Sequence, residues 1–404
     1  MTAPRSRRVL VLNGFGNNLG DQAIFAGFAD VFGEAVDRVG LDVTLDQSFV
    51  YDFPFRAETI ETLNEHYDLV VLGGGGILYH RPQDGSPSGW GFDIPQDLLR
   101  TLTVPYAIYS TGYNYRAYAP EHFPEQTAAH VRETVRRAAH FSVREPGSVR
   151  MLRERFGVEG GVELVPDCAL HVEPGRVHLP QLAADRPTVG LCLRLDRAQE
   201  RFAPPFAENF EHFVRTLIDS LRAMIEQDGC QVVFTPHLLT PNDVEVGELL
   251  KASLPRGSVV LLHEAMPALY AGASLDRPAL LAGVYQRCAA VLGQRLHSLI
   301  IPFAVGTPVV SMASTASSAW MQDYFGVDPR FHLDLTRPER DVTVERMTGA
   351  LRAAIADRVS LSERAFVRRS ELIGVARERT RELVDRTLAR PAAAREAQRF
   401  VRAS

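Results

Sequence analysis

The chain has 404 residues, of which 46% are hydrophobic and 23% are charged, and its formal net charge is −5. This length predicts two domains, each long enough to bury a core of its own. The acidic balance excludes a broad nucleic-acid-binding or anionic-membrane surface. Basic residues between Arg364 and Arg402 alternate with Glu and Ala at helical spacing, which indicates a solvated helix face.

The four cysteines, Cys168, Cys192, Cys230 and Cys288, are too widely spaced for a zinc site or a disulfide framework. Each adjoins an apolar run, as expected of buried thiols in a reducing compartment. The apolar run at residues 8–12 is too short for a signal peptide, and no stretch approaches the roughly 18 apolar residues of a membrane span. We therefore expect a cytoplasmic protein without a transmembrane segment.

Short aliphatic runs alternate with longer amphipathic segments, which is typical of βαβ units and parallel sheets. In the first half, strands are predicted at residues 8–12, 68–72, 105–110, 140–143 and 162–165. Helices are predicted at residues 21–32, 57–65, 125–138 and 146–156. The last of these begins at Pro146, because proline is favoured at the first helical position.

Residues 172–187 hold three prolines and no clear periodicity, and we interpret them as an interdomain linker. A second alternating half follows, with strands predicted at residues 188–193, 231–235, 258–262, 288–292 and 308–311. Its helices are predicted at residues 208–227, 243–254, 277–285 and 297–305. The expected fold is therefore α/β, with two doubly wound domains at 1–171 and 188–341, a cleft between them, and a helical tail at 342–404.

Parallel sheets bind ligands beyond the carboxyl ends of their strands, and two glycine-rich segments lie there. The first runs from Asn13 to Asp21 and leads into a helix, whose N-terminal N–H groups suit an anion. Asp21 is either a ligand contact or a helix N-cap. The second comprises Gly73, Gly74, Gly75 and Gly76, which favour close backbone approach to a ligand over a bare turn.

Three charged residues follow other strands. Arg144 closes a predicted strand just before Pro146, where its planar fork suits a carboxylate or phosphate; a structural pair with a glutamate across a domain edge is the alternative. Arg295 and His297 lie two apart where a strand gives way to a helix, so that one can bind an anion while the other transfers a proton. A histidine is more often structural, but the neighbouring arginine and glycine favour a functional role.

His237 and Arg194 also follow predicted strands and are secondary candidates for substrate binding. The sequence contains no nucleophile elbow, no zinc-binding H-E-x-x-H segment and no Walker A lysine.

These segments together resemble the polysaccharide pyruvyltransferases of cell-wall and exopolysaccharide synthesis. The matching pieces occur in the family's order and cover roughly residues 9–325; they are NLGDQAI at 18–24, DLVVLGGGG at 68–76, SVREPGS at 142–148, VPD at 165–167, TPH at 235–237 with Asp243, RLHS at 295–298 and AVGTP at 304–308. Ser298 closes the RLHS segment and is counted with the substrate-binding residues.

The resemblance implies two Rossmann-like domains facing a cleft, as in GT-B glycosyltransferases, with the donor bound by the second domain. It implies phosphoenolpyruvate as the donor, neither metal nor cofactor, and a pyruvate ketal on a sugar as the product. The acceptor would be a sugar, a nucleotide sugar or a lipid-linked glycan. By similarity, Arg144, Arg295 and His297 would contact the donor, with His297 as the acid–base. The donor's phosphate and carboxylate call for two cationic contacts, and protonation of its methylene carbon calls for a general acid.

The chain departs from the family after its G-x-P segment. Many members carry a tyrosine and a lysine there, whereas residues 311–320 read SMASTASSAW. The acceptor, or part of the phosphate contact, is therefore expected to differ.

Two alternative functions stay open. A nucleotide-sugar glycosyltransferase of the same architecture would need an acidic residue for the ribose, for which Glu264 is the best candidate. A non-catalytic binding subunit would explain the missing lysine, but the intact Arg144, Arg295 and His297 count against it. A homo-oligomer is compatible with the sequence.

Overall fold

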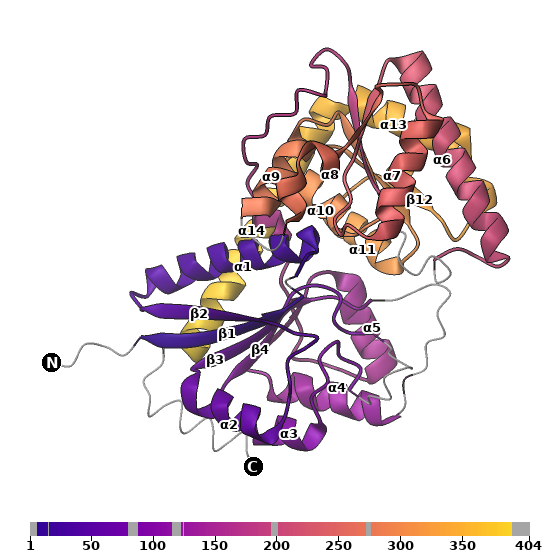
Figure 1. Ribbon diagram of the computed structural model, residues 1–404. Helices are drawn as coiled ribbons and strands as arrows, with labels where there is room; N and C mark the ends of the chain where they lie inside the picture. The colour runs from indigo at the N-terminus through magenta and orange to yellow at the C-terminus, as the bar shows by residue number, and fades with distance from the viewer. Residues whose placement is uncertain are drawn as a thin grey trace.

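The computed structural model describes residues 6–14, 16–79, 88–114, 123, 125–194, 201–271 and 276–389. Two sheets of six strands each form two lobes, one above the other in Figure 1. All the strand pairs within both sheets are parallel. The fold is thus the predicted α/β architecture with two Rossmann-like domains.

The first lobe carries strands β1 to β6 in the order β2-β1-β3-β4-β5-β6. The strands are β1 (Arg7–Asn13), β2 (Val43–Phe49), β3 (Leu69–Gly73), β4 (Tyr106–Thr111), β5 (His140–Val143) and β6 (Glu163–Leu164). The helices are α1 (Leu19–Arg38), α2 (Ala57–His66), α3 (Gln96–Thr101), α4 (Glu125–Arg137), α5 (Pro146–Phe156) and the 3-10 helix η1 (Cys168–His171).

The second lobe carries strands β7 to β12 in the order β12-β11-β10-β7-β8-β9. The strands are β7 (Thr188–Cys192), β8 (Gln231–Phe234), β9 (Val259–Leu261), β10 (Ala290–Gly293), β11 (Val309–Ala313) and β12 (His332–Asp334). The helices are α6 (Phe206–Asp228), α7 (Pro241–Ser253), α8 (Leu262–Ala265), η3 (Pro267–Tyr270), α9 (Asp276–Gln286), α10 (His297–Ala304), α11 (Ala316–Phe325), η4 (Pro329–Phe331), α12 (Pro338–Asp341), α13 (Val344–Ala356) and α14 (Arg358–Thr387).

Local sequence explains where several helices begin and end. Thr240 and Asp243 form a reciprocal capping box at the start of α7, with Pro241 at the first helical position. Helix α5 begins at Pro146, as predicted, and ends where Gly157 adopts a left-handed conformation with φ of 65°.

Each sheet has a point at which its strand order reverses. In the first lobe β1 pairs with both β2 and β3, and in the second lobe β7 pairs with both β8 and β10. Connections leave in opposite directions from such a pair, so a crevice opens beyond the carboxyl ends of its strands. The two crevices are therefore expected beyond β1 and β3 and beyond β7 and β10.

The predicted strands and helices are all present, but the sequence analysis missed several short or half-exposed elements, among them β2, β12, α3 and α11. Strand β2 is a half-buried edge strand that carries Asp46, Gln47 and Ser48, so its apolar pattern is weak. Strand β12 has only three residues, and α3 only six. Helix α11 falls in the serine-rich segment that sequence reasoning left unassigned.

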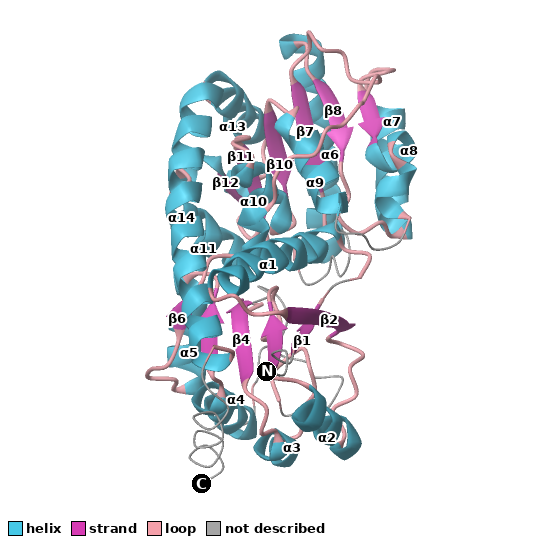
Figure 2. Cartoon of the chain, turned by 90° about the vertical axis from the view of Figure 1, so that its left-hand side faces the viewer, coloured by secondary structure: helices cyan, strands magenta, loops and turns pink. Residues whose placement is uncertain are grey.

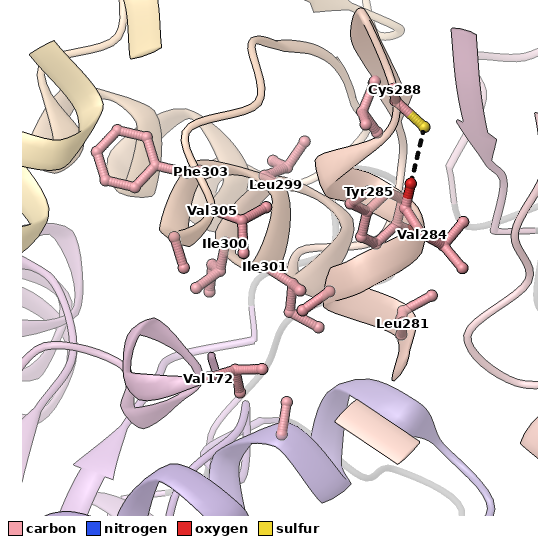
Figure 3. Packing of buried hydrophobic residues seen from close by; sticks show 14 of the residues in the cluster. Val172, Leu281, Val284, Tyr285, Cys288, Leu299, Ile300, Ile301, Phe303 and Val305 are labelled. Atoms are coloured by element: carbon pink, nitrogen blue, oxygen red, sulfur yellow. Dashed lines mark hydrogen bonds between the residues drawn. The ribbon is translucent and has the colours of Figure 1, made fainter. Parts of the chain in front are cut away.

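The lobes share a continuous apolar interface. Helix α1 lies between them (Figure 2), and its Leu19 N–H donates to the His237 carbonyl oxygen across a distance of 2.8 Å. Leu19 and Leu170 belong to the same buried cluster as residues of α9 and α10. Figure 3 shows part of that cluster, with Ile300 and Ile301 above Val172. Burial of this kind is the main favourable term in holding two lobes together.

The tail is helical, as predicted, and it runs back across the first lobe. Helix α14 passes along both lobes in Figure 2. Arg38 forms an ion pair with Asp385, and the Tyr109 hydroxyl lies 2.6 Å from Thr380 Oγ1. None of the helices in the described part of the chain combines the length and apolar character that crossing a bilayer requires.

Candidate active site

One polar pocket of about 180 Å³ lies where the two crevices face each other. The first lobe supplies one wall, and we call its lining residues the first wall: Asn18, Asp21, Tyr51, Gly76, Asn114 and Arg144. The second lobe supplies the second wall: Arg194, His237, Gln294, Arg295, Leu296, His297, Thr315, Ser317 and Ser318. Folding thus gathers Asp21, Gly76, Arg144, Arg194, His237, Arg295 and His297, all of which the sequence had singled out.

Helix α1 begins at the pocket. Asn18, rather than Asp21, is its N-cap, and the Asn18 side chain accepts a hydrogen bond from the Gly20 N–H. Asp21 therefore lies in the first turn, with its carboxylate on the pocket. Burial raises the pKa of Asp21, although His297 and Arg144 favour its ionised form.

The four glycines after β3 have different surroundings. Gly74 and Gly75 have φ values of 75° and 76°, and a Cβ at Gly74 would overlap Ile24 of α1. Only Gly76 is among the residues that line the pocket. The run is therefore explained mainly by a left-handed turn packed against α1, and direct ligand contact is retained for Gly76 alone.

Arg144, Asp167 and His297 form a buried network that joins the two lobes. Arg144 is 3% exposed, and its Nη1 donates to Asp167 Oδ2 across 3.1 Å. His297 Nε2 lies 3.5 Å from the same carboxylate oxygen. Sequence reasoning had quoted Asp167 only as part of a motif, because no local pattern shows that it lies between these two side chains.

The pKa values of two acidic side chains in this network shift in opposite directions. Burial alone would raise the pKa of Asp167, but His297 and Arg144 outweigh it and lower the value to about 2. Burial dominates for Glu145, which is fully buried, and raises its pKa to about 7 despite the nearby Arg144. Glu145 Oε2 lies 3.4 Å from Arg144 Nε, and Oε1 accepts from the Ser148 hydroxyl. Arg144 therefore faces the pocket and also pairs with a glutamate, although that glutamate is its neighbour in the chain and does not lie across a domain edge.

The second wall follows strands β7 and β10. Arg295 is 8% exposed and lies two residues before His297, the first residue of α10. Gln294 Oε1 accepts from the Arg194 backbone N–H across 2.7 Å, which ties the ends of the two strands together. Ser298 does not line the pocket; its hydroxyl donates to the Arg295 carbonyl oxygen across 2.6 Å, so we assign it a supporting position.

His237 lies deeper in the same wall and is 1% exposed. Its Nε2 is 2.7 Å from the Tyr285 hydroxyl, and its Nδ1 has no hydrogen-bond partner among the described residues. Burial lowers its pKa well below the usual value, and His297 and Arg295 lower it further. A neutral ring with one unpartnered nitrogen is suited to contact a bound ligand.

The serine-rich segment that lacks the lysine closes the pocket. Thr315 is the N-cap of α11 but its side chain makes no capping bond, so the first-turn N–H groups are available on that side. Thr315, Ser317 and Ser318 line the pocket, and the Thr315 hydroxyl lies 3.1 Å from that of Ser317 and 3.3 Å from that of Ser318. Sequence reasoning missed these residues and the amides Asn18 and Asn114, since neutral polar residues carry no distinctive motif.

Glu264, the acidic residue that a glycosyltransferase would need, lies elsewhere. It is on α8, paired with Lys251 Nζ at 2.9 Å, and is not among the lining residues of the pocket.

Comparison with protein families agrees with this geometry. The model of the family described as "Polysaccharide pyruvyl transferase" matches residues 18–315, a span that begins and ends at pocket-lining residues. The chain belongs to this family. It is a family of transferases. No curated protein matches the chain significantly.

Similar solved structures show the fold. The S. aureus MnaA–UDP co-structure has a TM-score of 0.53 and 11% identity, covering 89% of this chain and 90% of that one. UDP-GlcNAc 2-epimerase from Neisseria meningitidis, bound to UDP-GlcNAc, has a TM-score of 0.52 and 10% identity, with 89% and 94% coverage. A kitacinnamycin glycotransferase has a TM-score of 0.50 and 14% identity, with 95% and 100% coverage. At these identities the likeness establishes a GT-B-like fold and nothing further.

Proposed function

We propose that the protein transfers a pyruvyl group from phosphoenolpyruvate to two hydroxyls of a sugar or glycan precursor, forming a ketal. The observation that carries the proposal is the concentration of Arg144, Arg194, Arg295 and His297 around one small pocket. Its volume of about 180 Å³ is below the roughly 300–1,000 Å³ that is usual for drug-sized ligands. A small, highly charged donor fits such a space better than a nucleotide sugar does.

The donor's two anionic groups would be bound by different features. Arg295 and Arg144 offer planar guanidinium groups, which suit charge-assisted, forked hydrogen bonds to a carboxylate or phosphate. The N-terminus of α11 adds backbone N–H groups and the Thr315 and Ser317 hydroxyls to the same pocket. In our proposal these groups support the phosphate in place of the lysine that the chain lacks.

His297 is the proposed acid. Its Nε2 faces Asp167, which can pair with the protonated ring, so that Nδ1 is left to address the donor. Gly20 keeps room beside that nitrogen, because a Cβ there would lie 2.5 Å from His297 Nδ1. Asp167 would act as a positioning residue, since it touches His297 and Arg144 rather than the reacting atoms.

The reaction balances without a further reactant. His297 protonates the methylene carbon, and the central carbon becomes electrophilic as its double bond is lost. One acceptor hydroxyl forms the first C–O bond and loses its proton. The bond to phosphate then breaks, and the second hydroxyl forms the second C–O bond. Of the two released protons, one restores His297 and the other leaves with phosphate or solvent; the half-buried Asp21 carboxylate is placed to accept a hydroxyl proton.

The test is phosphate release from phosphoenolpyruvate in the presence of a panel of sugars, nucleotide sugars and lipid-linked glycans. Acceptor-dependent release is expected, and in D₂O one deuteron should enter the product's methyl group. If no acceptor elicits release while a nucleotide sugar is consumed instead, the pyruvyl-transfer proposal is wrong and the glycosyltransferase alternative holds. The same assay with EDTA present tests the expectation that no metal is needed, with unchanged turnover as the expected result.

A further inference from the structure

Two large aromatic side chains lie exposed beside the pocket. Phe49, the last residue of β2, is 36% exposed, and Tyr51 is 39% exposed. Their ring centroids are 5.3 Å apart with an interplanar angle of 65°, an edge-to-face arrangement. Tyr51 also lines the pocket, so the pair is continuous with the first wall. Exposed aromatic rings grouped at the edge of a polar cavity are typical of a ligand surface.

Glycines hold the Tyr51 ring in place without covering it. A Cβ at Gly91 would lie 2.8 Å from Tyr51 Cε1, and one at Gly14 would lie 3.6 Å from Cε2, so each side of the ring's hydroxyl end abuts a glycine. The same Cβ at Gly14 would be 3.2 Å from the Asp21 carboxylate. A single glycine therefore separates the aromatic ring from a charged group of the pocket.

We propose that Phe49 and Tyr51 form a platform for a pyranose ring of the acceptor; this inference rests on the proposed pyruvyl transfer. One face of a pyranose presents mainly C–H groups, and the faces of aromatic rings carry negative charge density that attracts them. The hydroxyls at the sugar's edge would then reach the Asn18 and Asn114 amides, which line the same wall. The platform would set one sugar of the acceptor beside Asp21, where its hydroxyls meet the donor.

Charge argues that this surface takes the acceptor rather than the donor. Aromatic faces do not attract anions, and phosphoenolpyruvate carries both a phosphate and a carboxylate. The second wall, by contrast, holds Arg194, Arg295 and His297. The two substrates would therefore enter side by side, the donor on the cationic wall and the sugar on the aromatic one.

Binding of methyl pyranosides is measured by saturation-transfer NMR and by titration, with the wild type and four variants. The panel comprises methyl hexosides and their N-acetylated and uronic-acid forms. Tyr51→Ala and Phe49→Ala should each weaken binding of the preferred pyranoside by about 2- to 12-fold, the usual size of an aromatic contact. Tyr51→Phe keeps the ring and should bind within about twofold of the wild type. Phe366→Ala, on α14 and 44% exposed, is the matched control and should change nothing.

A parallel titration with phosphoenolpyruvate separates this inference from the proposed function. Both alanine variants should bind the donor as the wild type does. If pyranosides bind the wild type and both variants equally, or transfer no saturation even with the wild type, the platform is wrong although donor binding stands. If pyranoside binding depends on the two rings but phosphoenolpyruvate does not bind, the platform holds and pyruvyl transfer fails.

Discussion

The two walls of the pocket differ in chemistry although the two lobes share one architecture. The second wall carries four cationic or imidazole side chains, Arg194, His237, Arg295 and His297, and no acidic residue among those that line it. The first wall carries Asp21, two asparagines, an aromatic ring and a glycine, and its one cation, Arg144, is already bound by Asp167. The two lobes thus share a fold but line the pocket with side chains of different charge.

This difference in charge indicates that the two walls bind different substrates. An anion would be drawn to the second wall because the side chains that line it include two arginines and two histidines and no carboxylate. A neutral, hydroxyl-rich molecule would suit the first wall, where amides and a carboxylate can bond to hydroxyls. Variants on the second wall should therefore affect the donor, as should those of Arg144, the one cation of the first wall. Variants of the other first-wall residues should affect the acceptor or the junction between the lobes.

The largest effect is expected at His297. His297→Gln should lower turnover by about 10²- to 10⁴-fold, the usual contribution of a general acid, while phosphoenolpyruvate affinity falls far less. Deuteron entry into the product methyl group should be lost together with turnover. His66→Gln, on the exposed end of α2, serves as the control. Normal turnover in His297→Gln would move the acid to another residue, with His237 tested next.

A smaller effect is expected from the arginines. Arg295→Ala and Arg144→Ala should each weaken phosphoenolpyruvate binding by about 10- to 100-fold, because a hydrogen bond to a charged group contributes about 1.5–3 kcal/mol. Lysine at either position should restore only part of the affinity, since the planar fork is lost. Calorimetric titration measures both, with Arg222→Ala on the surface of α6 as a control. Donor affinity unchanged in the Arg295 variant would contradict the assignment of the donor to the second wall.

Substitution of Gly74, in the glycine run after β3, should mainly lower the stability of the protein. Gly74→Ala places a side chain at φ of 75° and against Ile24, so the free energy of unfolding should fall by more than the roughly 1–2 kcal/mol of the left-handed backbone alone. Gly40→Ala isolates the backbone contribution, because its φ is 64° and no atom lies within 4 Å of the added Cβ. Denaturant unfolding of both variants gives the comparison. Equal losses would show that packing against α1 contributes nothing.

The smallest effect concerns the pH dependence at Glu145. Its pKa of about 7 means that the carboxyl is neutral below that pH and ionised above it. Ionised Glu145 competes with the donor for Arg144, so donor affinity should fall a few-fold as the pH rises through about 7. Glu145→Gln should lack this step, and the difference between the two binding profiles removes the donor's own titration. Parallel profiles would exclude Glu145 as the titrating group.

Sequence periodicity accounted for the type and approximate position of most elements, because burial on one face imposes a local repeat on every long helix and central strand. Helix α5, predicted at residues 146–156, has those bounds in the structure. The failures were short or half-exposed elements such as β2 and β12, in which too few buried positions exist to establish a pattern.

The sequence predicted the site residues that are basic and come directly after a strand. It did not predict the neutral residues of the pocket, or those that reach it from distant parts of the sequence. Arg144, Arg295 and His297 could be named because parallel strands present their carboxyl ends at one edge. Asp167 contacts both Arg144 and His297, and this position could not be predicted. The two partners lie 23 and 130 positions away from it in the sequence. The position of the Tyr51 ring could not be predicted either, because the ring packs beside Gly91, which lies forty residues further along the chain.

By itself, the sequence determined that this chain forms parallel α/β units and that cations, glycines and a histidine stand at strand ends. These follow from local periodicity and composition, which each segment carries on its own. Only the tertiary structure decided which strands lie next to each other, and hence that the reversal between β1 and β3 faces the reversal between β7 and β10. Strand order is set by packing and hydrogen bonds between distant segments, so the pocket exists only once both lobes have folded and docked around α1.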